Sequence, residues 1–287
     1  MKIKVSIIIP YYKSKKSLLK LVKSIPEVEG IEIIIIDDHS YDIDIKDIRH
    51  PCVQLLRQQK GKKWAGAARN LGMSISKGEY LLFADADDYF LPNAFNVILT
   101  CCAKNYDIVY FTPTSIKDNG EKSKRHTSYK ELVDAYIEKQ DVSIKYRYHV
   151  PWSKLIKKSL VVDNNITFDE VIASNDVNFS LKSSFYAKNI IALKDEIYCV
   201  VESDSSLTKL TTLEVSNSRF NAISRYNDFL ISHEDSNLAA MSGHIWNARK
   251  FGMKLLLSRL FYSLKKGYKI FYDFQHIIKV IKREFKN

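Results

Sequence analysis

The sequence predicts an α/β fold built on a mostly parallel β-sheet with helices on both faces. Over the first 112 residues, short apolar runs rich in Ile and Val alternate with segments of helical periodicity. The runs are apolar throughout rather than alternating with polar residues, which indicates strands buried on both faces. Strands that alternate with helices are typical of parallel sheets with helical crossovers. From about residue 211 the pattern is helical and has no strand-like run, so we expect a helical C-terminal extension.

The expected strands end at polar residues or at proline. They lie over Val5–Ile9, Ile31–Ile36, Val53–Leu56, Tyr80–Ala84 and Asp107–Phe111, and Pro10 ends the first of them. Helices are expected over Lys16–Ile25, Ala65–Ser76 and Pro92–Lys104. Residues 117–148 are more polar and predict loop plus helix, and residues 150–195 mix apolar and charged segments.

In parallel sheets, ligands bind beyond the carboxyl ends of the strands. Polar groups follow three of the expected strands: Pro10-Tyr11-Tyr12, Asp37-Asp38 and Asp85-Ala86-Asp87. We therefore expect these groups to converge on one crevice.

Composition narrows the class of protein. The 287 residues, 46% hydrophobic and 27% charged, suit a soluble globular chain with a proper core. No apolar run approaches the roughly 20 residues of a membrane span, and we expect Met1–Pro10 to be a first strand rather than a signal peptide. Cys52, Cys101, Cys102 and Cys199 form no Cys-x-x-Cys pair, so we expect reduced cytoplasmic thiols without a zinc site. The net charge of +11 requires an anionic partner: nucleic acid, an anionic membrane or a polyanionic substrate.

The acidic segment after the fourth expected strand is the strongest chemical signal. If that strand is buried, the pleat turns Asp85 and Asp87 to the same side. Two neighbouring carboxylates repel each other, and a divalent cation between them removes that repulsion. A cation held by only a few protein oxygens has coordination positions left for phosphate oxygens. The alternative is structural, with Asp88 capping the next helix.

Two further segments suit a nucleotide. Asp37 or Asp38 can accept a hydrogen bond from a nucleobase imide or a ribose hydroxyl, or else form an Asx-turn. Tyr11 can stack on a base, or be an ordinary loop aromatic. The segment Gly61–Gly72 is small and basic and opens a helix, and with Arg69 it favours phosphate. The Gly-rich turns of dinucleotide-binding and P-loop proteins are absent from the sequence.

Together these segments resemble the inverting sugar transferases of glycosyltransferase family 2. The resemblance covers roughly residues 3 to 210. Its most specific part is Ala67-Ala68-Arg69-Asn70, then Gly78-Glu79-Tyr80, then Phe83-Ala84-Asp85-Ala86-Asp87-Asp88. The other matching stretches are Val5–Ser14, Ile33–Ser40 and, less strictly, Trp152–Leu181. The resemblance implies a GT-A fold, a Rossmann-like sheet flanked by helices.

The resemblance also implies a role for each matching residue. Pro10, Tyr11, Asp38 and Arg69 would hold the nucleoside of a nucleotide sugar, most often UDP. Ala86 and Asp85 would lie near the ribose or sugar, and Asp87, with Asp85, would bind Mn²⁺ or Mg²⁺ on the diphosphate.

The acceptor side of the expected site lies about 90 residues further on. By resemblance, Asp176 is the base, and Asn175 replaces the acidic neighbour that the family usually has. Trp152 would form the floor of the acceptor site, or else pack in the core. Asp169 and Glu170 are rival bases. Displacement at an anomeric carbon needs a base for the acceptor hydroxyl and charge neutralisation on the leaving diphosphate.

The tail sets the expected partner surface and the domain boundaries. Basic residues from Arg249 to Lys286 alternate with apolar ones from Phe251 to Phe285, and helical spacing puts the two kinds on different faces. This pattern predicts basic amphipathic helices on an anionic membrane, or helices packed on the domain with a solvated basic face. We expect a catalytic domain over residues 1–210, with halves of about 1–112 and 113–210, and an extension over 211–287.

The resulting expectation is a metal-dependent inverting hexosyltransferase. It would use a UDP-sugar, with UDP-galactose favoured, and a lipid-linked or oligosaccharide acceptor in surface polysaccharide synthesis. It would be cytoplasmic and peripheral at the inner face of a bacterial plasma membrane. The alternatives are a membrane-associated scaffold without activity and a nucleic-acid-binding protein; no nucleic-acid-binding module occurs in the sequence.

Overall fold

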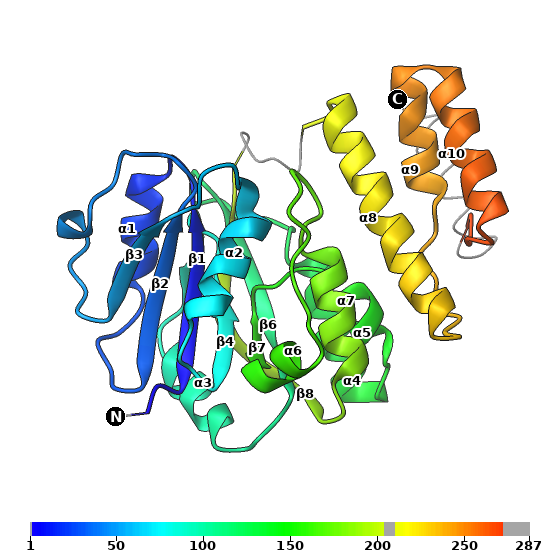
Figure 1. The fold of residues 1–287 in the computed structure, drawn as a ribbon. Coiled ribbons are helices and arrows are strands. Elements are labelled where there is room, and N and C mark those ends of the chain that lie inside the picture. The colour runs from blue at the N-terminus through cyan, green and yellow to red at the C-terminus, as the bar shows by residue number, and fades with distance from the viewer. Residues whose placement is uncertain (1, 204–209, 272–287) are drawn as a thin grey trace.

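The structure, a computed structural model, describes residues 2–203 and 210–271. Its centre is one eight-stranded sheet in the order β3-β2-β1-β4-β7-β6-β8-β5 (Figure 1). The strands are β1 (Val5–Tyr11), β2 (Ile31–Asp37), β3 (Val53–Arg57), β4 (Tyr80–Phe83), β5 (Tyr89–Phe90), β6 (Ile108–Lys117), β7 (Lys154–Lys157) and β8 (Ile190–Glu202). The predicted α/β class is confirmed.

Helices cover the sheet and continue beyond it. They are α1 (Lys15–Lys23), α2 (Trp64–Ile75), α3 (Ala94–Cys102), α4 (Thr127–Lys139), α5 (Ser143–Arg147), α6 (Lys158–Asp163), α7 (Val177–Tyr186), α8 (Leu213–Ser232), α9 (Ser242–Asn247) and α10 (Met253–Lys265). Short 3₁₀ turns lie at η1 (Ile45–Asp47) and η3 (Ala248–Phe251).

The sheet is mostly parallel, as predicted, but it is mixed. Strand β1 pairs in parallel with β2 and β4, β2 with β3, and β6 with β8. Strand β7 is antiparallel to both β4 and β6, and β5 is antiparallel to β8. The sequence did not predict β5, β7 or β8. Strand β7 has only four residues, two of them lysines, so no apolar run marks it.

Several predicted strand ends differ from the structure, the largest difference being β6, which was predicted to end at Phe111 and continues to Lys117. Two of the differences matter for the site. Strand β1 continues through Pro10 to Tyr11. The β1–β4 ladder ends at Ile8, so proline, which lacks an N–H, is tolerated where that side of β1 has no paired strand. Strand β4 ends at Phe83, so the following carboxylates lie in a turn and the pleat argument does not apply to them.

Strand β2 shows how both faces of the sheet are buried. Ile34 and Ile36 pack against Ala68 of α2, whereas Ile33 and Ile35 belong to the main core on the other face. Helix α2 lies close to the sheet because Gly72 has no side chain: a Cβ there would come within 2.5 Å of Ile8 Cγ2. The close approach holds the N-terminus of α2 near the carboxyl ends of β1 and β2.

The helical C-terminal extension packs on the first part of the chain through α7. Val177 and Leu181 of α7 share a second hydrophobic cluster with residues of α8 to α10, among them Tyr226, Leu230 and Leu256. Figure 1 shows α8 running beside α7, with α9 and α10 outside it. Among residues 2–203 and 210–271, no helix is both long enough and apolar enough to cross a membrane.

Helix α10 departs from the predicted division of faces. Arg259 is only 3% exposed and donates to Ser216 Oγ, Asn217 Oδ1 and the carbonyl of His244. An outward row of apolar side chains is exposed instead, formed by Met253, Leu257, Phe261 and Leu264. The prediction that basic residues occupy the solvated face was therefore wrong for Arg259, because α10 buries it as a hydrogen-bond donor. The predicted tail residues 272–287 lie outside the described residues.

Candidate active site

A cleft of about 510 Å³ lies at the carboxyl ends of β1, β2 and β4. All the predicted site residues line it: Pro10, Tyr11, Asp38, Arg69, Asp85, Ala86, Asp87, Trp152, Asn175 and Asp176. The expected convergence on one crevice is therefore observed, although the role of each residue remains a prediction. The cleft also takes in Tyr12, Arg125 and, from α8, Arg219. No sequence motif marks the two arginines, because they reach the cleft only through tertiary packing.

The acidic pair after β2 is divided between structure and binding. Asp37 accepts from the backbone N–H groups of Ser40 and Tyr41, so it forms the turn that was the structural alternative. Asp38 accepts from the backbone N–H of Trp64 at 2.7 Å through Oδ2. Its Oδ1 is buried and accepts no hydrogen bond from the residues that the structure describes. Burial raises the pKa of Asp38, and an unpaired buried carboxylate oxygen indicates a donor supplied by a ligand.

The two tyrosines after Pro10 have different environments. Tyr11 is 1% exposed and its hydroxyl donates to Asp42 at 2.8 Å, so its ring is packed in the core. Tyr12 is 59% exposed and lines the cleft. The exposed ring available for stacking at this edge is therefore Tyr12 rather than the predicted Tyr11, because β1 is longer than expected and ends with Tyr11 facing inward.

The turn after β4 is tied to β8 by Tyr198. The Tyr198 hydroxyl donates to Asp88 Oδ2 and accepts from the backbone N–H of Asp85, both at 2.8 Å. Asp88 is buried and also accepts from Val201 N–H at 2.7 Å. Burial raises its pKa well above the usual range. Asp88 therefore supports the turn formed by Asp85–Asp88, which we call the acidic turn. The prediction that Asp88 caps the next helix was wrong, since the residue before α3 is Asn93.

Arg69 of α2 links the acidic turn to the opposite wall of the cleft. Its Nη2 donates to Asp85 Oδ1 at 2.5 Å and its Nη1 donates to Asn175 Oδ1 at 2.7 Å. The guanidinium is largely buried, so its charge offsets that of Asp85 inside the protein. Arg69 lines the predicted nucleotide site, but both its Nη groups are already bonded to protein.

Asp87 is the carboxylate that opens into the cleft. It remains accessible although protein surrounds it on most sides. Burial and then the neighbouring Asp85 carboxylate raise the pKa of Asp87 to about 6. Within the described residues, no group of three His, Cys, Asp or Glu side chains can hold a metal ion. The arrangement fits a hard cation held by one or two carboxylates, with its other ligands supplied by substrate and water.

Asp176 occupies the position before α7 and faces the cleft from the other side. Burial raises the pKa of its carboxyl, and Arg69 opposes that effect. The rival bases do not line the cleft: Asp169 pairs with Arg225 at 2.8 Å and Glu170 pairs with Lys62. Of the three carboxylates, Asp176 alone faces the acidic turn.

Trp152 also lines the cleft. It is 2% exposed and stacks on Tyr198, with ring centroids 6.0 Å apart and planes at 18°. Its packing therefore supports the same tyrosine that holds the acidic turn. Both predicted roles, floor of the site and core packing, are compatible with this position.

Comparison with known proteins identifies the family. Residues 6–163, more than half of the chain, match the family described as Glycosyl transferase family 2. This chain belongs to glycosyl transferase family 2. Membership places it among the glycosyltransferases. The matched residues include the acidic turn and Trp152, whereas Asn175 and Asp176 lie beyond them.

Individual family 2 relatives are similar at lower levels. The poly(ribitol-phosphate) beta-glucosyltransferase of Bacillus spizizenii is 30% identical over 213 residues, which cover 70% of this chain and 33% of that protein. The GalNAc(5)-diNAcBac-PP-undecaprenol beta-1,3-glucosyltransferase of Campylobacter jejuni is 27% identical over 214 residues, 70% of this chain and 66% of that protein. This chain thus spans about a third of the first relative's length and two thirds of the second's.

A solved structure supports the GT-A fold. The crystal structure of S. aureus TarS 1–349 in complex with UDP-GlcNAc matches with a TM-score of 0.67 at 18% identity. The match covers 88% of this chain and 74% of that chain. At this identity the likeness establishes the fold of the family 2 chain and not its substrates.

The acidic turn predicts a pH-dependent stability. A carboxyl whose pKa is higher in the folded chain binds its proton more tightly when folded, so stability falls as pH rises from about 4 through the folded pKa. For Asp87 this loss is complete above about pH 6. We expect Asp87→Asn to raise the melting temperature at pH 7.5 in EDTA and to leave it unchanged at pH 4, because the neutral amide avoids first the cost of burying a charge and then the repulsion from Asp85. Calorimetry at both pH values measures this. The exposed Asp118 provides the control Asp118→Asn, and equal effects of the two variants at pH 7.5 would contradict the assignment.

Proposed function

We propose that this chain transfers a hexose from a UDP-sugar to a hydroxyl group of a lipid-linked or oligosaccharide acceptor in bacterial surface polysaccharide synthesis. The observation that carries the proposal is that Asp38, Asp87 and Asp176 all line one cleft. The names of the relatives support it: they act on poly(ribitol-phosphate) and on an undecaprenol-linked glycan, and one solved neighbour binds UDP-GlcNAc.

The donor nucleotide would bind at the edge formed by β1 and β2. The unpaired Asp38 Oδ1 suits the imide N–H of uracil, and the exposed Tyr12 ring suits stacking on the base. Pro10 and Ala86 line the same part of the cleft. We retain UDP-galactose as the favoured donor, followed by UDP-glucose and the UDP-N-acetylhexosamines.

The diphosphate would lie over the acidic turn. Asp87, with Asp85 beside it, would hold Mn²⁺ or Mg²⁺, which supplies charge neutralisation for the departing diphosphate when bound. Arg69 holds Asp85 in place and limits the negative charge of the turn. Tyr198 and Asp88 fix the backbone of the turn from behind.

Asp176 would take the proton of the acceptor hydroxyl. Its raised pKa makes it a stronger base than an ordinary aspartate, and its position opposite the acidic turn suits attack in line with the departing diphosphate. A single displacement inverts the anomeric centre. Retention through a covalent sugar–enzyme intermediate would need a second carboxylate beside the anomeric carbon as nucleophile, whereas Asp85 is paired with Arg69. Trp152 and Asn175 would contact the acceptor.

The enzyme proposal predicts a specific loss in Asp176→Asn. Without the base, we expect kcat for transfer to fall by about 10²–10⁴-fold, while the affinity for UDP is unchanged. A panel of UDP-sugars with synthetic lipid-diphosphate acceptors and Mn²⁺, followed by product mass spectrometry, measures transfer. Glu170→Gln is the matched control, because Glu170 is paired with Lys62 outside the cleft. Absence of product with wild type across the panel, or full activity in Asp176→Asn, would contradict the proposal.

The nucleotide proposal predicts an altered base preference in Asp38→Asn. The Trp64 N–H would keep the amide oxygen, so the amide NH₂ would replace Oδ1. The amide NH₂ is a hydrogen-bond donor. It cannot bond the uracil imide N–H, which is also a donor, but it can bond cytosine N3, which is an acceptor. We expect UDP affinity to fall by about ten- to a hundredfold and CDP affinity to rise, as measured by isothermal titration calorimetry. Asp42→Asn, which changes a carboxylate bonded to Tyr11 instead, is the control. An unchanged ratio of UDP to CDP affinity would exclude Asp38 from base recognition.

We also propose that α10 docks the enzyme on the inner face of the plasma membrane as a peripheral, cytoplasmic protein. The outward row of Met253, Leu257, Phe261 and Leu264 follows helical spacing and is exposed, with exposed Lys254 and Lys265 beside it. An apolar stripe next to lysines suits insertion at an anionic lipid surface. Such docking would bring the cleft near a lipid-linked acceptor.

The membrane proposal predicts that Leu257→Ser with Phe261→Ser reduces binding to phosphatidylglycerol vesicles by about tenfold or more, because the inserted apolar area is lost. Co-sedimentation measures the binding, and phosphatidylcholine vesicles test the role of charge. Val162→Ser, which removes an exposed apolar side chain from α6, is the control. Equal binding of the double variant and the control would place the contact elsewhere.

A further inference from the structure

One wall of the cleft is a loop that we call the acceptor loop, residues Phe168–Asp176. Its last five residues line the cleft. The loop lies beyond the residues that match the family and carries the proposed base at its end. What holds this loop in place therefore decides where Asp176 lies relative to the acidic turn.

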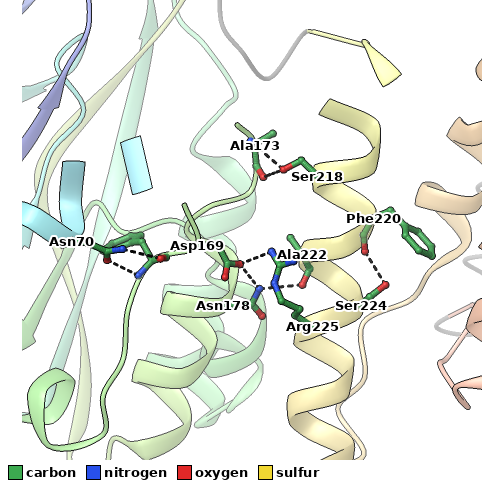
Figure 2. A network of polar contacts seen from close by, with 10 residues as sticks. Asn70, Asp169, Ala173, Asn178, Ser218, Phe220, Ala222, Ser224 and Arg225 are labelled. Atoms are coloured by element: carbon green, nitrogen blue, oxygen red, sulfur yellow. Dashed lines mark hydrogen bonds and ion pairs between the residues drawn. The ribbon is translucent and has the colours of Figure 1, made fainter. Parts of the chain in front are cut away.

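The start of the acceptor loop is held by α2. The Asn70 side chain donates to the Phe168 carbonyl at 3.0 Å and accepts from the Phe168 N–H at 2.8 Å (Figure 2). Helix α2 and the loop are in direct contact at Gly66, where a Cβ would lie 2.0 Å from the Asp169 carbonyl oxygen. The loop consequently has no room to move toward α2.

The far side of the acceptor loop is held by α8. Ser218 Oγ donates to the Ala173 carbonyl at 2.7 Å and accepts from the Ala173 N–H at 3.3 Å. About two turns further along α8, Arg225 donates to Asp169 Oδ2 at 2.8 Å. Figure 2 shows both contacts reaching the loop from the same helix face. Two residues of α8 thus bind the loop at its middle and near its start.

Helix α7 adds a third link between the loop and α8. The Asn178 amide donates to Asp169 Oδ2 at 2.7 Å and to the Ala222 carbonyl at 3.1 Å (Figure 2). Asp169, a rival candidate for the base on sequence grounds, therefore serves as the acceptor at which α7 and α8 meet the loop. Its carboxylate is committed to two donors and faces away from the cleft lining.

The loop backbone is strained at the residue between its fixed points. Ser174 has φ of 56°, a left-handed conformation that costs a non-glycine residue roughly 1–2 kcal/mol. Ala173 before it is bonded to Ser218. Asn175 after it accepts from Asp169 N–H at 3.0 Å through its carbonyl, and its side chain accepts from Arg69. Such a conformation persists where surrounding contacts over-determine it.

We propose that Ser218 and Arg225 of α8 are positioning residues for the transfer reaction. They hold the acceptor loop in the strained conformation that aims Asp176 and Asn175 at the acidic turn. The C-terminal helices thus complete the active site in addition to any contact with a membrane. This inference rests on the proposed function, because it assigns Asp176 as the group being positioned.

The test compares two serines on the same helix. Ser218→Ala removes both bonds to Ala173, whereas Ser224→Ala removes an equivalent hydroxyl that donates only to the Phe220 carbonyl within α8. We expect Ser218→Ala to lower kcat by about tenfold with KM for the UDP-sugar within about twofold of wild type, and Ser224→Ala to leave both unchanged. Ser218→Thr, which keeps the hydroxyl, should restore most of the activity. In the Asp176→Asn background, Ser218→Ala should cause no further loss, because it acts through the base.

Hydrogen exchange provides a readout that does not depend on catalysis. We expect faster exchange at the Ala173 amide in Ser218→Ala than in Ser224→Ala, at equal melting temperatures. If exchange is faster in Ser218→Ala but the wild type has no transferase activity, the proposed function is contradicted, whereas the conclusion that Ser218 holds the loop still stands. Unchanged exchange, or loss of kcat that persists equally in the Asp176→Asn background, would overturn the positioning role. Arg225→Lys and Arg225→Ala test the second contact by the same measurements.

Discussion

The buried guanidinium of Arg69 is the interaction on which the rest of the cleft depends. It is bonded to Asp85 on one wall and to Asn175 on the opposite wall, so one side chain fixes the separation of the two walls. A planar fork with several donors can do this, whereas a lysine could not bond both partners in a fixed geometry. The bond also offsets the charge of Asp85. The pKa values of Asp87 and Asp88 are raised by their own burial and then by the neighbouring carboxylates, Asp85 among them.

The other hydrogen bonds around the cleft reduce the electrostatic cost of having several carboxylates in and around one site. Asp88 is buried and accepts hydrogen bonds from two donors, the Tyr198 hydroxyl and the Val201 N–H. Asp169 is paired with Arg225. Asp38 and Asp87 are left with oxygens that face the cleft. Among these four, the carboxylates with satisfied oxygens thus build the site, and the two with open oxygens are assigned to ligands.

The C-terminal helices present two different faces. The inner face of α8 reaches the acceptor loop through Ser218 and Arg225, and the outer face of α10 presents apolar side chains to solvent. Arg259 lies on the buried side of α10 and donates hydrogen bonds to α8, so this side packs through hydrogen bonds as well as apolar contacts. The apolar row of α10 lies on the exposed side. Because α8 and α10 pack together, the proposed membrane contact on α10 and the loop that carries the proposed base are connected through the same group of helices.

The sequence by itself determined the α/β class, the mostly parallel sheet and the residues that meet at its edge. Each apolar run marks a strand and the polar residues after it mark the strand's carboxyl end. Since parallel strands have their carboxyl ends at the same edge of the sheet, these polar residues are expected to meet there. Local patterning alone did not distinguish Asp37 from Asp38, or Asp87 from Asp88, because adjacent aspartates are chemically identical; the resemblance to family 2 singled out Asp38 and Asp87. The tertiary structure gives the physical reason for the division, because it supplies backbone donors to Asp37 and Asp88 from segments as distant as β8. Only the tertiary structure decided the contacts of Ser218 and Arg225, whose partners lie some fifty residues away, where no local pattern can indicate a contact.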